Sequence, residues 1–185
     1  MNTTSTLTTV TVTTLEMTAP EQLHPTDPPP GDIAVRQVAH PLPEFNRFFY
    51  TAVGGDWYWI DRLNWDYRRW LAWVDRPTLE TWVLYADDTP AGYFELECQD
   101  NGAVEVAYFG LIAAFTGRGL GGYLLTRAVR RAWELGARRV WLHTCTLDHP
   151  NALANYQARG LRVVSSVTEQ RALPATTPGP WSGAR

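Results

Sequence analysis

The sequence contains no lysine, so all 16 residues counted as Lys+Arg are arginine. This absence excludes a P-loop of the G-x-x-x-x-G-K-[ST] type, whose lysine binds phosphate. It also excludes a pyridoxal phosphate enzyme, which needs a lysine to form its Schiff base. The protein therefore cannot be acetylated on a lysine side chain of its own.

Cysteine is also scarce, because only Cys98 and Cys145 are present. Two cysteines cannot form a disulfide framework, and the first residues do not read as a signal peptide, so we expect a reducing, cytoplasmic location. No apolar run reaches the 18 residues typical of a membrane span, so we expect no membrane partner. The net charge of -3 makes nucleic acid a poor candidate partner as well.

The 185 residues, 45% of them hydrophobic, are enough for one globular domain with its own core. Residues 1–31 are rich in threonine and proline and poor in large apolar side chains, which predicts a disordered tail. Alternating threonine and valine in residues 8–14 leave open a strand added to a sheet edge. Residues 172–185 are predicted to be a flexible tail, and the domain is therefore placed at residues 32–171.

Hydrophobic periodicity and turn residues divide this domain into strands and helices. Strands are predicted at 33–39, 80–86, 91–99, 103–113, 139–145 and 161–167, and helices within 45–74, at 119–135 and at 150–159. This order predicts an α/β (α+β mixed) fold, with a mixed, mostly antiparallel central sheet of about seven strands flanked by helices.

The strongest local signal is a glycine-rich turn, Thr116-Gly117-Arg118-Gly119-Leu120-Gly121-Gly122, between a predicted strand and the helix that follows it. Glycines let backbone N–H groups approach an anion closely, and a helix N-terminus already favours negative charge. Arg118 adds a charged donor. The turn therefore predicts a site for phosphate or diphosphate.

Two other interpretations of this turn are open. Gly117, Gly119 and Gly122 satisfy the dinucleotide pattern G-x-G-x-x-G. That pattern needs an acidic residue at the end of the next strand, but this strand ends in Leu142-His143-Thr144-Cys145. The turn could also have a purely structural role.

The turn resembles the pyrophosphate loop Q/R-x-x-G-x-G/A of the GNAT superfamily of N-acetyltransferases, with Thr116 in place of the glutamine or arginine. Tyr156-Gln157-Ala158-Arg159-Gly160-Leu161 is similar to the family's Y-x-x-x-G-F. The resemblance covers residues 32–167 and implies a GNAT-like acyl-CoA N-acyltransferase fold. It also implies an enzyme that moves acetyl from acetyl-CoA, with no metal, to a primary amine of a small molecule or peptide by direct attack. A non-catalytic acyl-CoA-binding or sensing module is the alternative, and a homodimer is left open.

The resemblance also assigns roles to residues. Tyr156 matches the general acid, with a buried core tyrosine as the alternative. Glu105 and His143 are two candidates for the general base, although either could be structural and a water chain could replace both. The implied acetyl-CoA contacts are Phe109, Gly110, Leu111, Thr116, Gly117, Arg118, Gly119, Leu120, Gly121, Gly122, His149 and Asn151. A β-bulge is expected at Gly110.

The resemblance implies that the two helices of this region wall the acceptor site, and five of the nine tryptophans lie there, between Tyr50 and Trp73. Trp57, Trp59, Trp65 and Tyr108 are predicted to bind the amine by stacking or cation–π contact, with nearby aspartates Asp56, Asp61 and Asp66 pairing with its charge. At least half of the rings in this stretch are expected to pack the helices onto the sheet instead. The spacing of His143, Cys145 and His149 matches no standard zinc site, and Cys145 is not expected to carry an acyl group.

Overall fold

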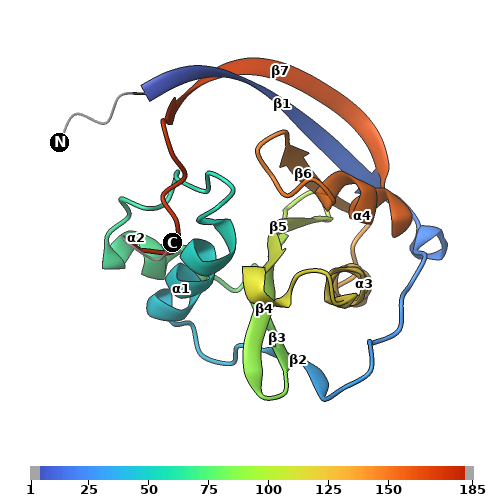
Figure 1. Ribbon diagram of the computed structural model, residues 1–185. Helices are drawn as coiled ribbons and strands as arrows, with labels where there is room; N and C mark the ends of the chain where they lie inside the picture. Colours follow the sequence, from blue (N-terminus) through green and yellow to red (C-terminus); the bar gives the residue numbers. More distant parts are fainter. Residues whose placement is uncertain (1–4, 182–185) are drawn as a thin grey trace.

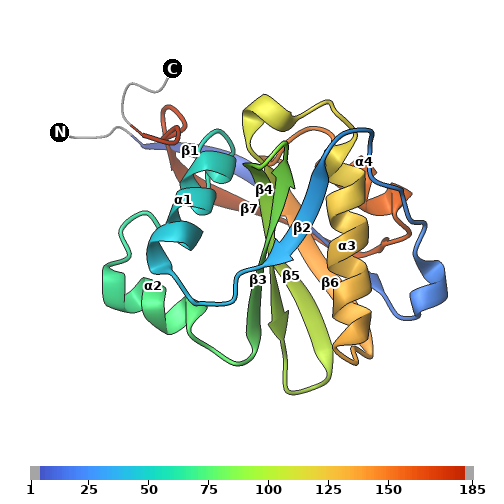
Figure 2. The same cartoon turned by 90° about the horizontal axis from the view of Figure 1, so that it is seen from below.

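The computed structural model describes residues 5–181 as one seven-stranded sheet with helices on both faces (Figures 1 and 2). The strand order is β2-β3-β4-β5-β6-β1-β7, and only β5 and β6 pair in parallel. The strands are β1 Ser5–Met17, β2 Ile33–Gln37, β3 Leu79–Ala86, β4 Thr89–Cys98, β5 Ala103–Leu111, β6 Arg139–Cys145 and β7 Arg162–Pro174. The predicted mixed, mostly antiparallel sheet is confirmed.

Helices α1 Pro43–Gly54 and α2 Tyr67–Val74 lie on one side of the sheet, and α3 Leu120–Glu134 and α4 Ala152–Ala158 lie on the other (Figure 2). Two short 3-10 turns, η1 Pro20–Gln22 and η2 Ala113–Phe115, complete the regular structure of the described residues. No helix within residues 5–181 is both long enough and apolar enough to cross a membrane.

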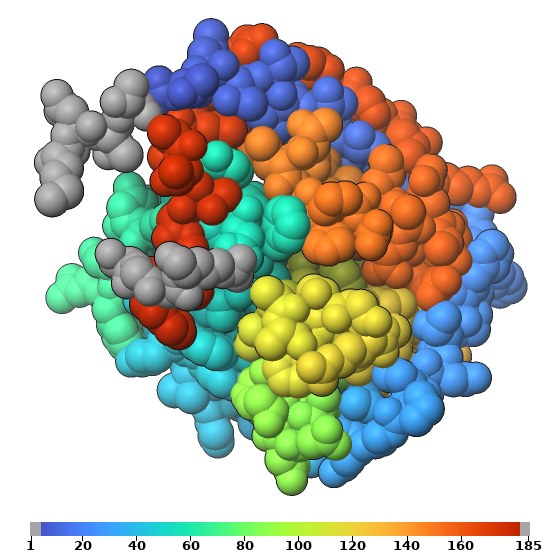
Figure 3. Space-filling model, viewed as in Figure 1, coloured from blue at the N-terminus to red at the C-terminus, as the bar shows by residue number. Residues whose placement is uncertain are grey.

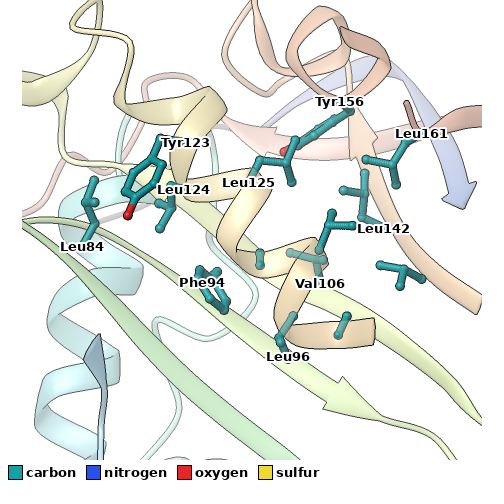
Figure 4. Packing of buried hydrophobic residues seen from close by; sticks show 14 of the residues in the cluster. Leu84, Phe94, Leu96, Val106, Tyr123, Leu124, Leu125, Leu142, Tyr156 and Leu161 are labelled. Carbon is teal, nitrogen blue, oxygen red and sulfur yellow. The ribbon is translucent and has the colours of Figure 1, made fainter. Parts of the chain in front are cut away.

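Side-chain alternation along the strands gives the sheet a core on each face. In β3, Val83 faces α1 and Leu84 faces α3. In β4, Tyr93 faces α1 and Phe94 faces α3. The larger core is completed by the apolar stripe of α3, where leucine and alanine recur every four residues from Leu120 to Ala132. Figure 4 shows side chains of the sheet packed around this helix. These two layers hold α1 and α3 in fixed positions against β4 and β5.

Strand β1 corrects the prediction of a disordered N-terminal tail. Its residues 12–17 pair with β6, and its residues 5–16 pair with β7, so it lies inside the sheet rather than at an edge. Val10 and Leu15 have no exposed surface. The threonines suit a strand because β-branched side chains pack well on a pleated surface. Residues 1–4 of the predicted tail lie outside the described residues.

The C-terminal segment differs from its prediction in part. Strand β7 continues to Pro174, past the expected start of a flexible tail, while residues 175–181 form no helix or strand. The Gly179 N–H donates to the Gly55 carbonyl at 3.0 Å, which holds this segment beside the end of α1. Residues 182–185 lie outside the described part of the chain. The sheet therefore includes strands at both ends that fall partly or wholly outside residues 32–171.

Candidate active site

Strands β5 and β6 pair over only three residues each and then separate. Residues 103–105 of β5 pair with residues 139–141 of β6, after which β5 follows β4 and β6 follows β1. A cavity of about 530 Å³ lies at this opening, which is within the range of about 300–1,000 Å³ usual for small-molecule sites. Figure 3 shows the segments after β5 (yellow) and after β6 (orange) facing α1 (teal) on one side of the molecule.

A β-bulge in β5 determines which side chains face this cavity. Glu105 pairs with Glu97 and Tyr108 pairs with Glu95, so β5 has one more residue than β4 over this stretch, at Ala107. The expected bulge at Gly110 is therefore wrong by three positions. Because the extra residue reverses the alternation of β5, Glu105 and Tyr108 face the same side of the sheet.

The glycine-rich turn forms one end of the cavity. Gly117 and Gly119 have φ angles of 75° and 78°, in the left-handed region, and Gly119 is the N-cap of α3. Residues of this conformation before a helix turn successive N–H groups toward one point, as an anion requires. A β-carbon at Gly117 would meet no atom within 4 Å, and no acidic residue lies in the first turn of α3. The turn thus fits a diphosphate.

Most of the predicted acetyl-CoA contacts line the cavity, but two do not. Phe109, Gly110, Leu111, Thr116, Gly117, Gly119, Gly121, Gly122, His149 and Asn151 line it. Leu120 is only 2% exposed and belongs to the core instead. Arg118 is exposed outside the lining, with its guanidinium 5.2 Å from the Phe115 ring centroid. The dinucleotide interpretation fails because a dinucleotide fold needs a mainly parallel sheet.

Tyr156 lies across the cavity from the strands, on α4. It is 7% exposed, its ring centroid is 5.9 Å from that of Phe109, and it contributes to the lining. Burial, together with the nearby Asp148 and Cys145, raises the pKa of Tyr156 above its ordinary value. The hydroxyl therefore stays protonated at neutral pH and can donate its proton.

Glu105 and His143, the two candidate bases, form one pair in the cavity wall. His143 Nδ1 lies 3.4 Å from Glu105 Oε1, and both residues line the cavity. The Glu105 carboxylate raises the pKa of His143 above its ordinary value, although burial acts in the opposite direction. The pair can accept a proton at either residue.

A sequence model of the acetyltransferase (GNAT) family matches residues 42–161 of the chain. The chain belongs to the GNAT acetyltransferase family. Its matched segment contains every residue of the turn, Tyr156 and the Glu105–His143 pair. No curated protein matches the sequence.

Solved structures share the GNAT fold at low sequence identity. A GCN5-related N-acetyltransferase from Sphaerobacter thermophilus has a TM-score of 0.68 at 16% identity, with 96% of this chain and 56% of that chain covered. One from Kribbella flavida has a TM-score of 0.61 at 21% identity, with 92% and 60% covered. The present chain thus spans less than two thirds of these two proteins.

A third similar structure is an aminoglycoside acetyltransferase from an uncultured soil metagenomic sample. Its TM-score is 0.56 at 14% identity, and the match covers 69% of this chain and 86% of that chain. At such identity the likeness shows the GNAT fold and no more.

The aromatic wall of this GNAT cavity differs in part from the prediction. Trp57, Trp59 and Tyr108 line the cavity, but Trp65 packs outside it, with its ring centroid 5.3 Å from that of Trp70. Of the seven tryptophans and tyrosines at residues 57–73, four line the cavity: Trp57, Tyr58, Trp59 and Trp73. Of these four, Trp59 also packs against the core beneath α1, and the Trp73 indole donates to Glu95, so lining the cavity does not by itself make a ring a substrate contact.

The three aspartates near the aromatic stretch have different surroundings. Asp61 lines the cavity, whereas Asp66 caps α2 by accepting a hydrogen bond from the Arg69 N–H at 2.8 Å. Asp56 does not belong to the lining. Only Asp61 is therefore placed to face an acceptor. Within residues 5–181, no three His, Cys, Asp or Glu side chains are grouped to hold a metal ion.

Sequence reasoning missed several residues that line the GNAT cavity. Val12 and Arg171 come from β1 and β7, which were assigned to the tail and to the end of the domain. Asp148 accepts hydrogen bonds from the Thr144 hydroxyl at 2.6 Å and the Cys145 N–H at 2.9 Å, which fixes the loop after β6. Arg62 also lines the cavity, and no motif in the sequence indicated it.

Proposed function

We propose that this protein transfers an acetyl group from acetyl-CoA to a primary amine of a small molecule or peptide by direct attack. The observation that carries this proposal is the opening between β5 and β6, where one cavity is lined by the glycine-rich turn, Tyr156 and the Glu105–His143 pair. An anion-binding turn, a proton donor and a proton acceptor are the three components that acyl transfer from a thioester requires.

The donor would be held by the turn and by β5. The backbone N–H groups of Gly117, Gly119 and Gly121 would bind its diphosphate, since Thr116 has no long polar side chain to share this task. The unpaired side of β5 at residues 109–111 offers backbone groups to the rest of the donor, because β6 has already separated. When bound, acetyl-CoA supplies an activated thioester carbonyl.

The chain's own residues would move two protons. Glu105 or His143 takes the proton from the attacking amine as its nitrogen forms a bond to the carbonyl carbon. Tyr156 gives its proton to the sulfur as the carbon–sulfur bond breaks, so the leaving group departs as a neutral thiol. A backbone N–H of β5 stabilises the negative charge that develops on the carbonyl oxygen.

The donor site is tested by titrating the protein with acetyl-CoA in a calorimeter, with Gly121→Leu as the decisive variant. We expect wild type to bind at one site per chain and Gly121→Leu to bind at least about 10-fold more weakly. A β-carbon at Gly121 has only ordinary contacts, 3.8 Å to Asn155 and to Leu111, so the backbone accepts a side chain at this position. Because Gly121 lines the cavity, the leucine would compete with the diphosphate for space.

Ala114→Leu is the matched control, because Ala114 is exposed in the same loop but does not line the cavity. It should bind acetyl-CoA like wild type. An absence of heat with wild type at millimolar acetyl-CoA would show that the turn is structural and would end this proposal.

The base is identified by the pH dependence of kcat. If His143 is the base, it must be unprotonated to act, and because Glu105 raises its pKa, we expect kcat to rise with pH above the ordinary histidine value of about 6.5. If His143 is the base, Glu105→Gln removes the cause of this shift, and the rise moves to lower pH. The measurement is the kcat profile of both proteins with one amine.

The charges facing His143 are Glu105 from β5, Asp148 from the loop after β6 and Arg171 from β7, of which Glu105 has the largest effect on its pKa. The ionisation of the amine is the same in both assays, so it does not affect the difference between the two pH profiles. A large loss of kcat at every pH, without a shift, would assign the base to Glu105. An unchanged profile in both Glu105→Gln and His143→Gln would leave the task to water.

A cytoplasmic location of the protein is part of the same proposal. Cys98 and Cys145 are both free, which suits the reducing interior of a cell. The oxidation state of the two cysteines, measured in protein taken directly from cells, would test this location.

A further inference from the structure

Arg62 is a buried cation in the cavity wall, between α1 and α2. It is 8% exposed, and its guanidinium carbon lies 3.7 Å from the Trp73 ring centroid, 4.3 Å from that of Tyr108 and 4.5 Å from that of Trp65. Its backbone N–H donates to the Tyr50 hydroxyl at 3.2 Å. The guanidinium is therefore fixed in an aromatic cage that opens on the site.

The counter-charge of this guanidinium is incomplete. Arg62 Nη1 lies 3.8 Å from Glu95 Oε2, which is beyond hydrogen-bonding distance, and Nη1 makes no hydrogen bond within the described chain. The Glu95 oxygens already accept from the Asn46 amide at 2.8 Å and the Trp73 indole at 2.7 Å. Burial also raises the pKa of Glu95, which weakens it as a partner.

Arg62 lines the cavity and has a buried, unused donor at Nη1, and unmade hydrogen bonds of a desolvated charge are costly, so an acceptor entering from the cavity would stabilise it. The other carboxylate on this wall, Glu97, is paired with Arg76 at 2.6 Å, and Asp61 is exposed. Arg62 lies over the rings of Trp65, Trp73 and Tyr108, so a ligand ammonium at these rings would meet a like charge. The chemistry that complements this wall is a carboxylate, whose two oxygens match the guanidinium fork.

We propose that Arg62 binds the carboxylate of an amine acceptor whose amine lies at the Glu105–His143 pair, an inference that rests on the proposed acetyl transfer. The bulge at Ala107 places Glu105 and the Arg62-bound Tyr108 on one face of β5. They pair with Glu97 and Glu95, so their α-carbons are separated by about 7 Å along the strand. The amine and carboxylate of an α-amino acid share one carbon and lie closer together than this spacing, so we expect an amine at the end of a longer chain.

The test compares 6-aminohexanoate with 6-aminohexanamide as acceptors, by thiol release from acetyl-CoA. Wild type should prefer the carboxylate by about 10-fold to 100-fold in kcat/KM, as a charged hydrogen-bonded pair would give. Arg62→Met should lose this preference, and Arg62→Lys should keep part of it. Arg69→Met is the matched control, because Arg69 also lies over Trp65, at 4.6 Å, but is exposed outside the cavity.

Binding of hexanoate and hexanamide, followed by tryptophan fluorescence, separates this inference from the proposed function. Selective binding of hexanoate that is lost in Arg62→Met supports the carboxylate site even if no amine is acetylated. Equal binding of the two probes by wild type overturns it. So does a preference that survives in Arg62→Met. If Arg62→Met does not fold, Arg62→Lys with a preference as large as that of wild type and an unchanged melting temperature would also contradict the role of the guanidinium fork.

Discussion

Tyr156→Phe is expected to lower kcat by about 100-fold to 1000-fold while leaving the affinity for acetyl-CoA almost unchanged. The substitution removes only the hydroxyl, and the ring keeps its contact with Phe109. Without the hydroxyl, the sulfur must leave as a thiolate, which is the costly event that the protonated tyrosine avoids. Steady-state kinetics with acetyl-CoA, together with calorimetric titration of the same variant, measures both quantities.

Tyr123→Phe is the control for this experiment. Tyr123 lies in α3, is 8% exposed and packs in the core outside the cavity lining (Figure 4). Its loss of a hydroxyl should leave kcat unchanged. If Tyr156→Phe also turned over like wild type, the acid would be another group or water. If wild type bound acetyl-CoA but acetylated no amine, the protein would be a sensing module on the GNAT fold.

Leu15→Ala is expected to lower the free energy of unfolding by about 2–5 kcal/mol, the cost of a cavity in a packed core. Leu15 is fully buried in β1 and packs with the α3 side of the sheet. A residue in a disordered tail would have no such effect. Chemical denaturation followed by circular dichroism measures this difference.

Leu7→Ala is the matched change on the same strand. Leu7 is 69% exposed, so its truncation should change stability by a few tenths of a kcal/mol at most. Two leucines eight positions apart should thus differ by more than 1 kcal/mol. Equal, small effects would mean that β1 does not hold its place between β6 and β7 in solution.

The sequence predicted most of the elements from residue 33 onward because their signals are local. The stripe from Leu120 to Ala132 is a helix pattern by itself, and alternation in β3 and β4 reports two buried faces. β1 gave a weaker signal, because its threonines are neither apolar nor strongly patterned. What holds it is pairing with β6 and β7, strands that no local pattern connects to it.

The candidate site was also predicted from the sequence only in part. The turn and Tyr156 were found because their spacing follows a known pattern, and the structure places both at one cavity. The bulge was placed at Gly110 instead of Ala107, because a bulge depends on the register with β4 and not on the glycine. Arg62 was missed because its importance comes from what surrounds it: the nearby Trp65 ring, together with Trp73 from α2, Tyr108 from β5 and the Glu95 carboxylate from β4.

The position of β1 also has a consequence for how the chain is made. The Thr11 and Thr168 hydroxyls lie 2.9 Å apart although the residues are 157 positions apart in the sequence. Strand β1 is synthesised before both of its neighbours, so it cannot pair until β6 and β7 have emerged. Contacts of such sequence separation slow folding, and they leave a threonine-rich strand unpaired until β6 and β7 have been made. Completion of this sheet therefore waits for the synthesis of β7.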